Sequence, residues 1–188
     1  MKQASDPVVI DIEQLRTRLR AAKPDALYHE IVNAPFELAK VEMAFLFLGI
    51  MVFLLVDEAS GEIERIALSN TELANNTLKV TTVPFKQIKI PVDYHENIIA
   101  QAIADQQPKD TIDWKFIFNP ALSAEEARTN QASAGIAYSA VYPLSGSRRG
   151  AMIFSYYQYQ HDIGEDQQRF MREYIDVVSE CLRAQQPG

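Results

Sequence analysis

Hydrophobic and polar positions along the chain change pattern most sharply between residues 43 and 70. An unbroken apolar run, MAFLFLGIMVFLLV, is followed by the polar corner DEASG and then by the alternating segment EIERIALSN. A continuous apolar run is typical of a strand covered on both faces, and an alternating one of a strand nearer a sheet edge. Matching the two arms predicts an antiparallel hairpin of residues 49–57 and 62–69, with residues 45–48 ending a preceding helix and Gly49 near its C-cap.

The N-terminal segment has the spacing of helices. Asp6 followed by Pro7 predicts a helix start, because an N-cap acceptor precedes a residue whose missing N–H costs nothing in the first turn. A second helix is expected through residues 28–32, and Pro35 is expected to start a third helical segment. A narrow apolar stripe on the first helix can pack against a helix of a partner chain or against the chain's own domain. The sequence does not decide between the two. The stripe consists of Val8, Ile12, Leu15, Leu19 and Ala22.

The second half of the chain predicts short strands and helices separated by proline, glycine and N-cap residues. Ser123 followed by acidic residues predicts the N-cap of a short helix, and Gly135 ends that helix. Aromatic and small residues on either side of a polar turn predict a second hairpin. The first expected elements are a strand-like segment at 85–91 and a helix that starts at Asp93 or His95 and is stopped by Pro108. An aromatic loop at 109–122 leads to the short helix. The hairpin of 136–144 and 151–159 follows, and a last helix runs from about 164 to 184.

The last helix has a wide apolar face. Two adjacent stripes cover about 160° of its circumference, whereas a helix docked on one core needs roughly 100°. The excess requires a second partner, which is either the N-terminal helix of the same chain or a second subunit. The stripes are Phe170, Tyr174, Val177 and Cys181, beside Met171, Ile175, Val178 and Leu182.

Composition narrows the class of protein. A chain of 188 residues with 47% hydrophobic and 23% charged residues is typical of one globular domain. The net charge of −7 argues against nucleic acid as a partner, because phosphate binding needs clustered Lys and Arg. The apolar run has 14 residues, fewer than the roughly 18–20 that span a bilayer as a helix, so we expect no membrane span.

Candidate chemistry is sparse. Cys181 is the single cysteine, which excludes an intrachain disulfide and a multi-cysteine zinc site and favours a reducing cytoplasm. His29, His95 and His161 lack the spacing of metal ligands, so we expect no metal site. No GxSxG, GxxxxGK or GxGxxG motif occurs. We therefore expect no catalytic residues and a protein that is not an enzyme.

Several short motifs recur in an order and spacing typical of one family. They are FLLVD with SG and IALS in the first hairpin, residues 97–103 followed by Gln107 and Pro108, VYPL at 141–144, RGAMIF at 149–154, and IGED at 163–166 before the last helix. Over residues 30–184 this series resembles the GAF domain family, a PAS-like sensory fold. The resemblance implies an α+β fold with a central antiparallel β-sheet flanked by helices, and with the N- and C-terminal helices packed together.

The resemblance also implies a division of the chain. Residues 1–34 are an N-terminal helical segment and a candidate dimerisation element, residues 35–184 the GAF-like domain, and residues 185–188 a short tail. GAF-like proteins bind cyclic nucleotides, tetrapyrroles, haem, amino acids or no known ligand, so the cofactor stays unknown. The tetrapyrrole-binding kind needs a cysteine near the pocket helices, but Cys181 lies late in the last helix. The free methionine sulfoxide reductase kind needs several cysteines, so we expect this chain not to run that dithiol reaction.

By resemblance, the aromatic loop and the short helix after it cover a cavity over the sheet. Trp114, Phe116 and Phe118 are its candidate ligand-binding residues, and Tyr138 and Tyr142 would line the sheet below them. The alternative is that these side chains, which bury roughly 150–250 Å² each, fill the cavity themselves. Both interpretations stay open.

The function expected from these features is a cytoplasmic sensory or regulatory domain, not an enzyme, that binds a small molecule over the sheet. The alternative is a dimerisation or scaffolding module without a ligand, which the stripe at residues 8–22 and the wide face of the last helix favour. An enzyme of unknown type comes third. The expected partners are a small-molecule ligand, a second copy of the chain bound through the terminal helices, and a separate effector protein that carries the output.

Overall fold

A six-stranded antiparallel sheet forms the centre of the protein, in the order β3-β2-β1-β6-β5-β4. The computed structural model describes residues 7–147, 149–157 and 163–185. The strands are β1 (Leu48–Asp57), β2 (Glu62–Leu68), β3 (Lys89–Pro91), β4 (Lys109–Thr111), β5 (Tyr138–Pro143) and β6 (Gly150–Tyr156). The predicted α+β architecture and both hairpins are confirmed, although positions 158 and 159 of the second hairpin lie outside the described residues.

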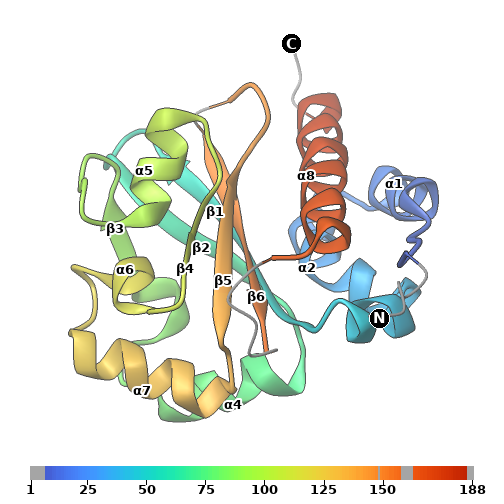
Figure 1. Ribbon diagram of the computed structural model, residues 1–188. Coiled ribbons are helices and arrows are strands. Elements are labelled where there is room, and N and C mark those ends of the chain that lie inside the picture. The colour runs from blue at the N-terminus through green and yellow to red at the C-terminus, as the bar shows by residue number, and fades with distance from the viewer. Residues whose placement is uncertain (1–6, 148, 158–162, 186–188) are drawn as a thin grey trace.

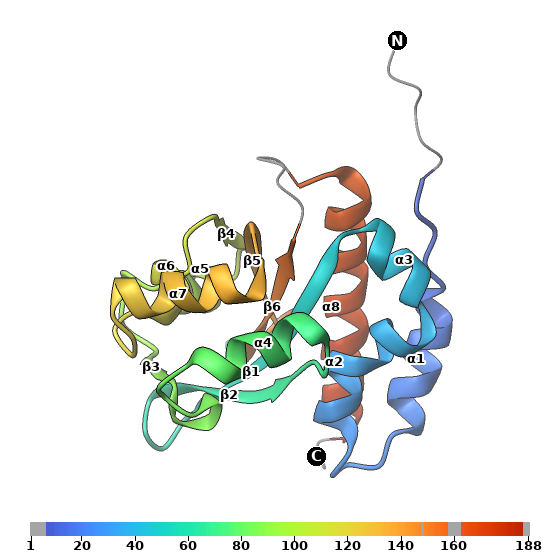
Figure 2. The same ribbon diagram turned by 90° about the horizontal axis from the view of Figure 1, so that it is seen from below.

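Helices cover both faces of the sheet (Figure 1, Figure 2). One layer contains α1 (Ile12–Ala21), α2 (Leu27–Leu38), α3 (Lys40–Phe45) and α8 (Glu165–Gln185). The other contains α4 (Glu72–Val80), α5 (Ile98–Asp105), α6 (Lys115–Phe118), α7 (Ala124–Ala134) and the 3-10 turn η1 (Phe85–Gln87). In the part of the chain that the structure describes, no helix combines the length and the apolar content needed to cross a membrane.

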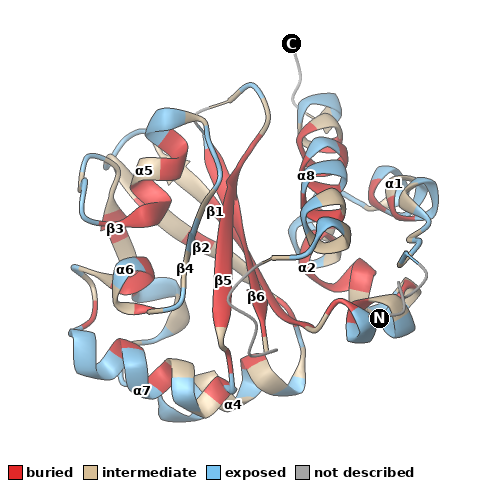
Figure 3. Ribbon diagram, viewed as in Figure 1, coloured by how far each residue is buried: buried red, intermediate tan, exposed pale blue. Residues whose placement is uncertain are grey.

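The central strands supply side chains to two hydrophobic cores. On β1, Met51 and Phe53 point into the core beneath α8, which we call the α8-side core. Ile50 and Leu54 point into the core beneath the other layer, which we call the α4-side core. Figure 3 shows β5 and β6 buried along their length. The prediction that the first arm of the hairpin is a central strand covered on both faces is confirmed.

A β-bulge interrupts the alternation predicted for β2. Phe53 pairs with Ala67, but the next residue, Leu54, pairs with Arg65, so Ile66 is the extra residue. In a regular strand, residues three positions apart point to opposite faces. Because of the bulge, Arg65 and Leu68 both face the α4-side core. The bulge therefore decides which side chains of β2 enter that core.

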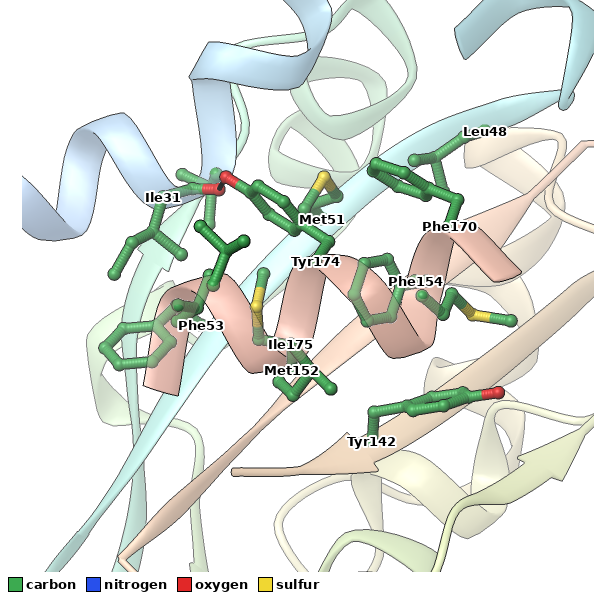
Figure 4. Close-up of a cluster of buried hydrophobic side chains, with 14 of the residues drawn as sticks. Ile31, Leu48, Met51, Phe53, Tyr142, Met152, Phe154, Phe170, Tyr174 and Ile175 are labelled. Atoms are coloured by element: carbon green, nitrogen blue, oxygen red, sulfur yellow. Dashed lines mark hydrogen bonds between the residues drawn. The ribbon is translucent and has the colours of Figure 1, made fainter. Parts of the chain in front are cut away.

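The wide apolar face of α8 is covered within the chain. Phe154 of β6 packs edge-on against Phe170, which stacks on Tyr174 (Figure 4). On the side away from the sheet, Leu15 and Leu19 of α1 belong to the same core. Arg16 and Arg20 of α1 also pair with Glu180 of α8. Of the two partners left open by the sequence, the N-terminal helices supply the second, and the predicted packing of the terminal helices is confirmed.

The first helix begins later than predicted. Asp11 caps it, accepting a hydrogen bond from the Gln14 N–H at 2.9 Å, whereas Asp6 lies outside the described residues. The residues before the helix are extended because they bond to α8. The Val8 N–H donates to Asp166 Oδ2 at 3.0 Å, and Arg169 donates to the Val8 carbonyl at 2.9 Å. Tertiary hydrogen bonds thus override the local start signal.

Pro35 does not start a new helix, as the sequence predicted, but lies inside α2. Proline has no N–H for the carbonyl four residues earlier, so the Ile31 carbonyl loses its helical donor. The hydroxyl of Tyr174 on α8 supplies one at 2.7 Å, and Figure 4 shows the two groups facing each other. Burial raises the pKa of Tyr174, which keeps the phenol protonated as a donor. Tyr174, which lies 143 positions from Ile31 in the sequence, therefore makes this proline tolerable.

Gly49 is a strand residue rather than a helix cap. The chain reverses at Phe47, which takes the left-handed conformation with φ 57°. A Cβ on Gly49 would lie 2.5 Å from Cδ1 of Leu73 on α4, so the glycine leaves room for that side chain. The predicted C-cap was wrong because α3 ends at Phe45 and Gly49 lies in β1, against Leu73 of α4.

Smaller differences concern the edges of the sheet. Only residues 89–91 of the strand expected at 85–91 form β3, and the preceding residues form η1. Asn97, not Asp93 or His95, caps α5. The segment expected to be only an aromatic loop contributes the edge strand β4 and the short helix α6. The start of α7 at Ser123, with a full capping box, and its end at Gly135 are confirmed.

Replacing Tyr174 by Phe should lower the free energy of unfolding by about 1–3 kcal/mol, because the buried Ile31 carbonyl then has no donor. Pro35→Ala restores a backbone N–H for that carbonyl. The loss caused by Tyr174→Phe should therefore be smaller in a Pro35→Ala background. Urea unfolding of the four proteins of this double-mutant cycle measures the coupling. Equal losses in both backgrounds would show that the hydroxyl does not compensate for the proline.

Candidate functional site

A small apolar cavity lies in the α4-side core between the sheet and helices α4, α6 and α7. Its volume is about 50 Å³. A water molecule takes up about 30 Å³ in the liquid, and an apolar cavity of about 150 Å³ holds benzene, so the space suits a group of a few atoms. The sheet contributes Ile50, Val52, Arg65, Leu68, Ile153 and Ser155 to the lining, and the helical layer contributes Thr77, Leu78, Trp114, Ile117, Phe118 and Asn130 among others.

Trp114 is a rigid part of the cavity wall. Its indole N–H donates to Ser139 Oγ at 2.9 Å, and Ser139 Oγ lies 2.7 Å from Ser155 Oγ. Its backbone N–H donates to the side chain of Gln131 at 2.9 Å. The indole ring also contacts the ring of Phe118, with centroids 5.4 Å apart. The single tryptophan of the chain is therefore fixed next to the cavity and can report on its contents.

Asn97 positions the α6 segment over the sheet. Its side-chain oxygen accepts a hydrogen bond from the Ile99 N–H at 2.8 Å, which caps α5. Its side-chain nitrogen donates to the carbonyls of Ile117 at 3.0 Å and Asn119 at 2.7 Å. Asn97 is completely buried, so the position of α6 relative to α5 is held by three hydrogen bonds inside the core.

Arg65 is the one charged residue in the cavity lining. Its side chain is buried, with 2% of the residue exposed, and Nη1 donates to the Ile88 carbonyl at 3.3 Å. The guanidinium lies over the Phe118 ring, 4.6 Å from its centroid. Nη2 has no hydrogen-bond partner, and no carboxylate of the described residues forms a salt bridge with the group. Burial lowers the pKa of Arg65 to about 9, so the group is still protonated at pH 7.

The contacts of Arg65 do not offset the cost of burying its charge. An uncompensated ion inside a protein costs several kcal/mol. The cation–π contact stabilises the buried guanidinium by about 2 kcal/mol at most, and the one long hydrogen bond to a carbonyl stabilises it by about as much. Strand β2 therefore carries a guanidinium that weakens the fold, which is typical of a residue kept for binding rather than for stability.

The structure does not bring the five predicted binding residues together. Trp114 and Phe118 line the cavity. Phe116 is 38% exposed, with the Lys115 ammonium 4.4 Å above its ring. Tyr138 and Tyr142 point to the other face of the sheet, into the α8-side core, where Figure 4 shows Tyr142. The sheet separates these tyrosines from the aromatic residues of α6.

The two tyrosines line a different hollow, which is open and polar. It has a volume of about 260 Å³ and includes Asp110 and Gln168 in its wall. Arg65 and Asn130, by contrast, line the cavity but were not expected there. For Arg65 a signal existed, because it alternates with Ile63 and so shares the buried face of its strand. Asn130 lies on a helix of weak amphipathicity and had no such signal.

Other reactive groups lie outside the cavity. Cys181 is buried in the α8-side core, on the opposite face of the sheet. Burial raises the pKa of its thiol. Across residues 7–147, 149–157 and 163–185, no group of three or more His, Cys, Asp or Glu side chains could hold a metal ion, and His161 is not among these residues.

Neither a protein-family model nor a curated protein matches the sequence, but solved structures match the fold. A methyl-accepting chemotaxis protein superposes with a TM-score of 0.61 at 14% identity, covering 91% of this chain and 96% of that one. The nlh2 GAF domain of A. aeolicus in an inactive state gives 0.59 at 10% identity, with coverage of 93% and 94%. At such identities the likeness shows the fold alone. The protein has the GAF-domain fold, as the motifs predicted.

The expectation that the chain is not an enzyme is corrected by the same comparison. Free methionine-R-sulfoxide reductase from Neisseria meningitidis, in complex with its substrate, matches with a TM-score of 0.59 at 16% identity, covering 97% of this chain and 93% of that one. The fRMsr of Staphylococcus aureus has the fold as well. Because this fold includes enzymes, it gives no ground for excluding enzymatic activity.

Arg65→Met should raise the free energy of unfolding by about 1–4 kcal/mol at pH 7, because it removes a buried charge and keeps the length of the side chain. The folded state binds the Arg65 proton more weakly than the unfolded state does. The cost is thus present at every pH below about 9 and shrinks as the pH rises towards the ordinary pKa of 12.5. Urea unfolding should show that Arg65→Met is more stable than the wild type at pH 7 and that this difference is smaller at pH 10.

Arg172→Met is the matched control for this prediction. Arg172 is exposed on α8, so its replacement removes the same charge and should change stability by less than about 0.5 kcal/mol. A loss of stability in Arg65→Met would show that the guanidinium is a compensated structural group and would contradict the binding interpretation.

Proposed function

We propose that this protein is a regulatory domain that senses a small ligand bound in the cavity between the sheet and helices α4 and α6. The observation that supports this most is the guanidinium of Arg65, which lines a mostly apolar cavity without a counter-charge among the described residues. Ligand sites are typically apolar hollows with a few convergent polar groups, and this cavity has that composition.

The solved structures with this fold include a methyl-accepting chemotaxis protein and the GAF domain of a two-component sensor histidine kinase. Carrying a signalling role over to this chain is part of the proposal. In this role the domain acts on a separate effector protein, and its single, buried cysteine suits a reducing cytoplasm.

Signal transmission would pass through the sheet. Ile153 of β6 lines the cavity, while its neighbours Met152 and Phe154 belong to the α8-side core. Phe154 contacts Phe170 of α8 at a centroid distance of 6.1 Å. A ligand that moves β6 therefore changes the surface on which α8 packs, and the exposed positions that α8 keeps between the sheet and α1 are where an effector would detect the change.

Filling the cavity should abolish ligand binding without unfolding the protein. Thr77 on α4 lines the cavity and is only half-buried, so Thr77→Leu adds apolar volume from a helix position that favours leucine. A metabolite library would be screened by Trp114 fluorescence and thermal shift. We expect at least one compound to raise the Tm of the wild type and to have no effect on Thr77→Leu, whose own Tm stays equal or rises. A library that shifts neither protein would contradict the proposal.

The second candidate function is a homodimer, and it needs a surface that the chain itself leaves uncovered, which the apolar stripes of the terminal helices do not provide. The apolar stripes of α1 and α8 are buried within the chain. On α3, however, Val41 and Phe45 lie one turn apart and are 63% and 66% exposed. This pair is the apolar surface through which a second copy would bind to the N-terminal helical layer.

Sedimentation at micromolar concentration tests the dimer. The wild type should sediment as a dimer and Phe45→Glu as a monomer, because a buried carboxylate in an apolar contact is unfavourable. Val80→Glu, at a 41% exposed position on α4, serves as the control and should stay dimeric. A monomeric wild type would rule out this function at that concentration.

A further inference from the structure

We propose that the ligand is a short monocarboxylate whose carboxylate pairs with Arg65 and whose apolar body occupies the cavity. This inference rests on the proposed function and adds the chemical class of the ligand. It follows from the charge, the hydrogen-bond capacity and the size of the cavity.

The charge of the site requires an anion. Arg65 is buried and protonated at neutral pH, and the described part of the chain provides no carboxylate to pair with it. A ligand with one negative charge would remove the cost of the isolated guanidinium, since an ion pair in a dry site is far more favourable than an unpaired ion. A neutral ligand of the same shape would leave that cost in place.

The hydrogen-bond capacity of Arg65 fits a carboxylate. A guanidinium presents its N–H groups in a planar fork that binds the two oxygens of a carboxylate together. Within the described part of the chain, Nη1 alone has a partner, the Ile88 carbonyl, and that contact is long at 3.3 Å. The guanidinium carbon lies over the Phe118 ring, 4.6 Å from its centroid, and both residues line the cavity. Nη2 is buried and has no partner among the described residues, so a carboxylate in the cavity would accept its hydrogen bond after a shift of the surrounding side chains.

The remaining lining argues against phosphate and sulfate. These ions carry more oxygens and more charge than one guanidinium can satisfy, and their binding sites usually combine several cations or backbone N–H groups. The other lining residues are apolar or carry a neutral polar group, such as Thr77, Asn130 and Ser155. Ser155 is already bonded to Ser139. An anion with one charge and an apolar remainder matches this lining.

The volume limits the length of the ligand. A space of about 50 Å³ is larger than one water and much smaller than a benzene site. Acetate, with four non-hydrogen atoms, needs the least movement of the wall, whereas butyrate has six, as many as benzene, and needs the side chains on the α4 side to move apart. The residues on the α4 side, among them the exposed Leu78 and the half-buried Phe85, are the part of the wall through which such an acid would enter.

The test compares acids with neutral analogues on three proteins, in a buffer free of carboxylates. Acetate, propionate and butyrate, the neutral propionamide, and sulfate and phosphate are titrated against the wild type, Arg65→Met and Arg172→Met. The readouts are Trp114 fluorescence and Tm. We expect propionate to bind the wild type and Arg172→Met equally, and to bind Arg65→Met at least about tenfold more weakly. Propionamide should bind the wild type at least about tenfold more weakly than propionate.

Several outcomes would overturn the inference. Equal binding of propionamide and propionate, unchanged propionate binding by Arg65→Met, or sulfate and phosphate binding as tightly as propionate would each reject the monocarboxylate class. If the acids fail while a neutral compound from the metabolite library binds the wild type but not Thr77→Leu, this inference is wrong and the proposed function stands. If neither the acids nor any library compound binds, both are wrong. Arg65→Met is expected to be more stable than the wild type, so its Tm confirms that lost binding is not unfolding.

Discussion

The structure depends on a sheet whose central strands are buried on both faces. Strands β1, β5 and β6 each supply alternate side chains to two cores, so a polar group on them is shielded from solvent and needs a partner inside the protein. The Tyr156 hydroxyl on β6 has none among the described residues. Ser139 and Ser155 meet this condition by bonding to each other and, through Ser139, to the indole of Trp114. The same chain of hydrogen bonds attaches the wall of the cavity to the sheet. Burial on two faces thus links the central strands to the candidate site.

The two faces of the sheet are covered in different ways. On the α8 side, a helix of 21 residues packs on the sheet through Phe170 and Tyr174 and is covered in turn by α1 and α2. The hydrogen bond from Tyr174 to the Ile31 carbonyl fastens α2 to α8 where Pro35 has removed a helical bond. On the α4 side, short helices cover the sheet and leave a cavity.

Local signals were sufficient for the elements whose causes are local. The apolar run followed by an alternating segment located β1 and β2, and the caps at Ser123 and Gly135 located α7. The errors at Pro7, Pro35 and Gly49 share a physical reason. The groups that decide these positions, on α8 and α4, are distant in sequence, so no nearby pattern carries the information.

The site was predictable to a similar extent. The aromatic content of the α6 segment pointed to Trp114 and Phe118. The face of Tyr138 and Tyr142 could not be derived, because a strand buried on both faces has no polar side to mark its orientation. The bulge at Ile66 was equally hidden, since it adds one residue without a glycine to indicate it.

Arg65 is the residue at which local and global requirements conflict. Its strand places it inward, its neighbours across the strand are apolar, and the bulge beyond it keeps Leu68 on the same face, so the surroundings favour a hydrophobic side chain. A sequence that specifies a stable fold normally avoids such a conflict, and exceptions concentrate at functional sites. Among the described residues, no carboxylate pairs with the guanidinium, as one normally would in a structural role. This unpaired charge beside the cavity is what the proposed ligand would neutralise.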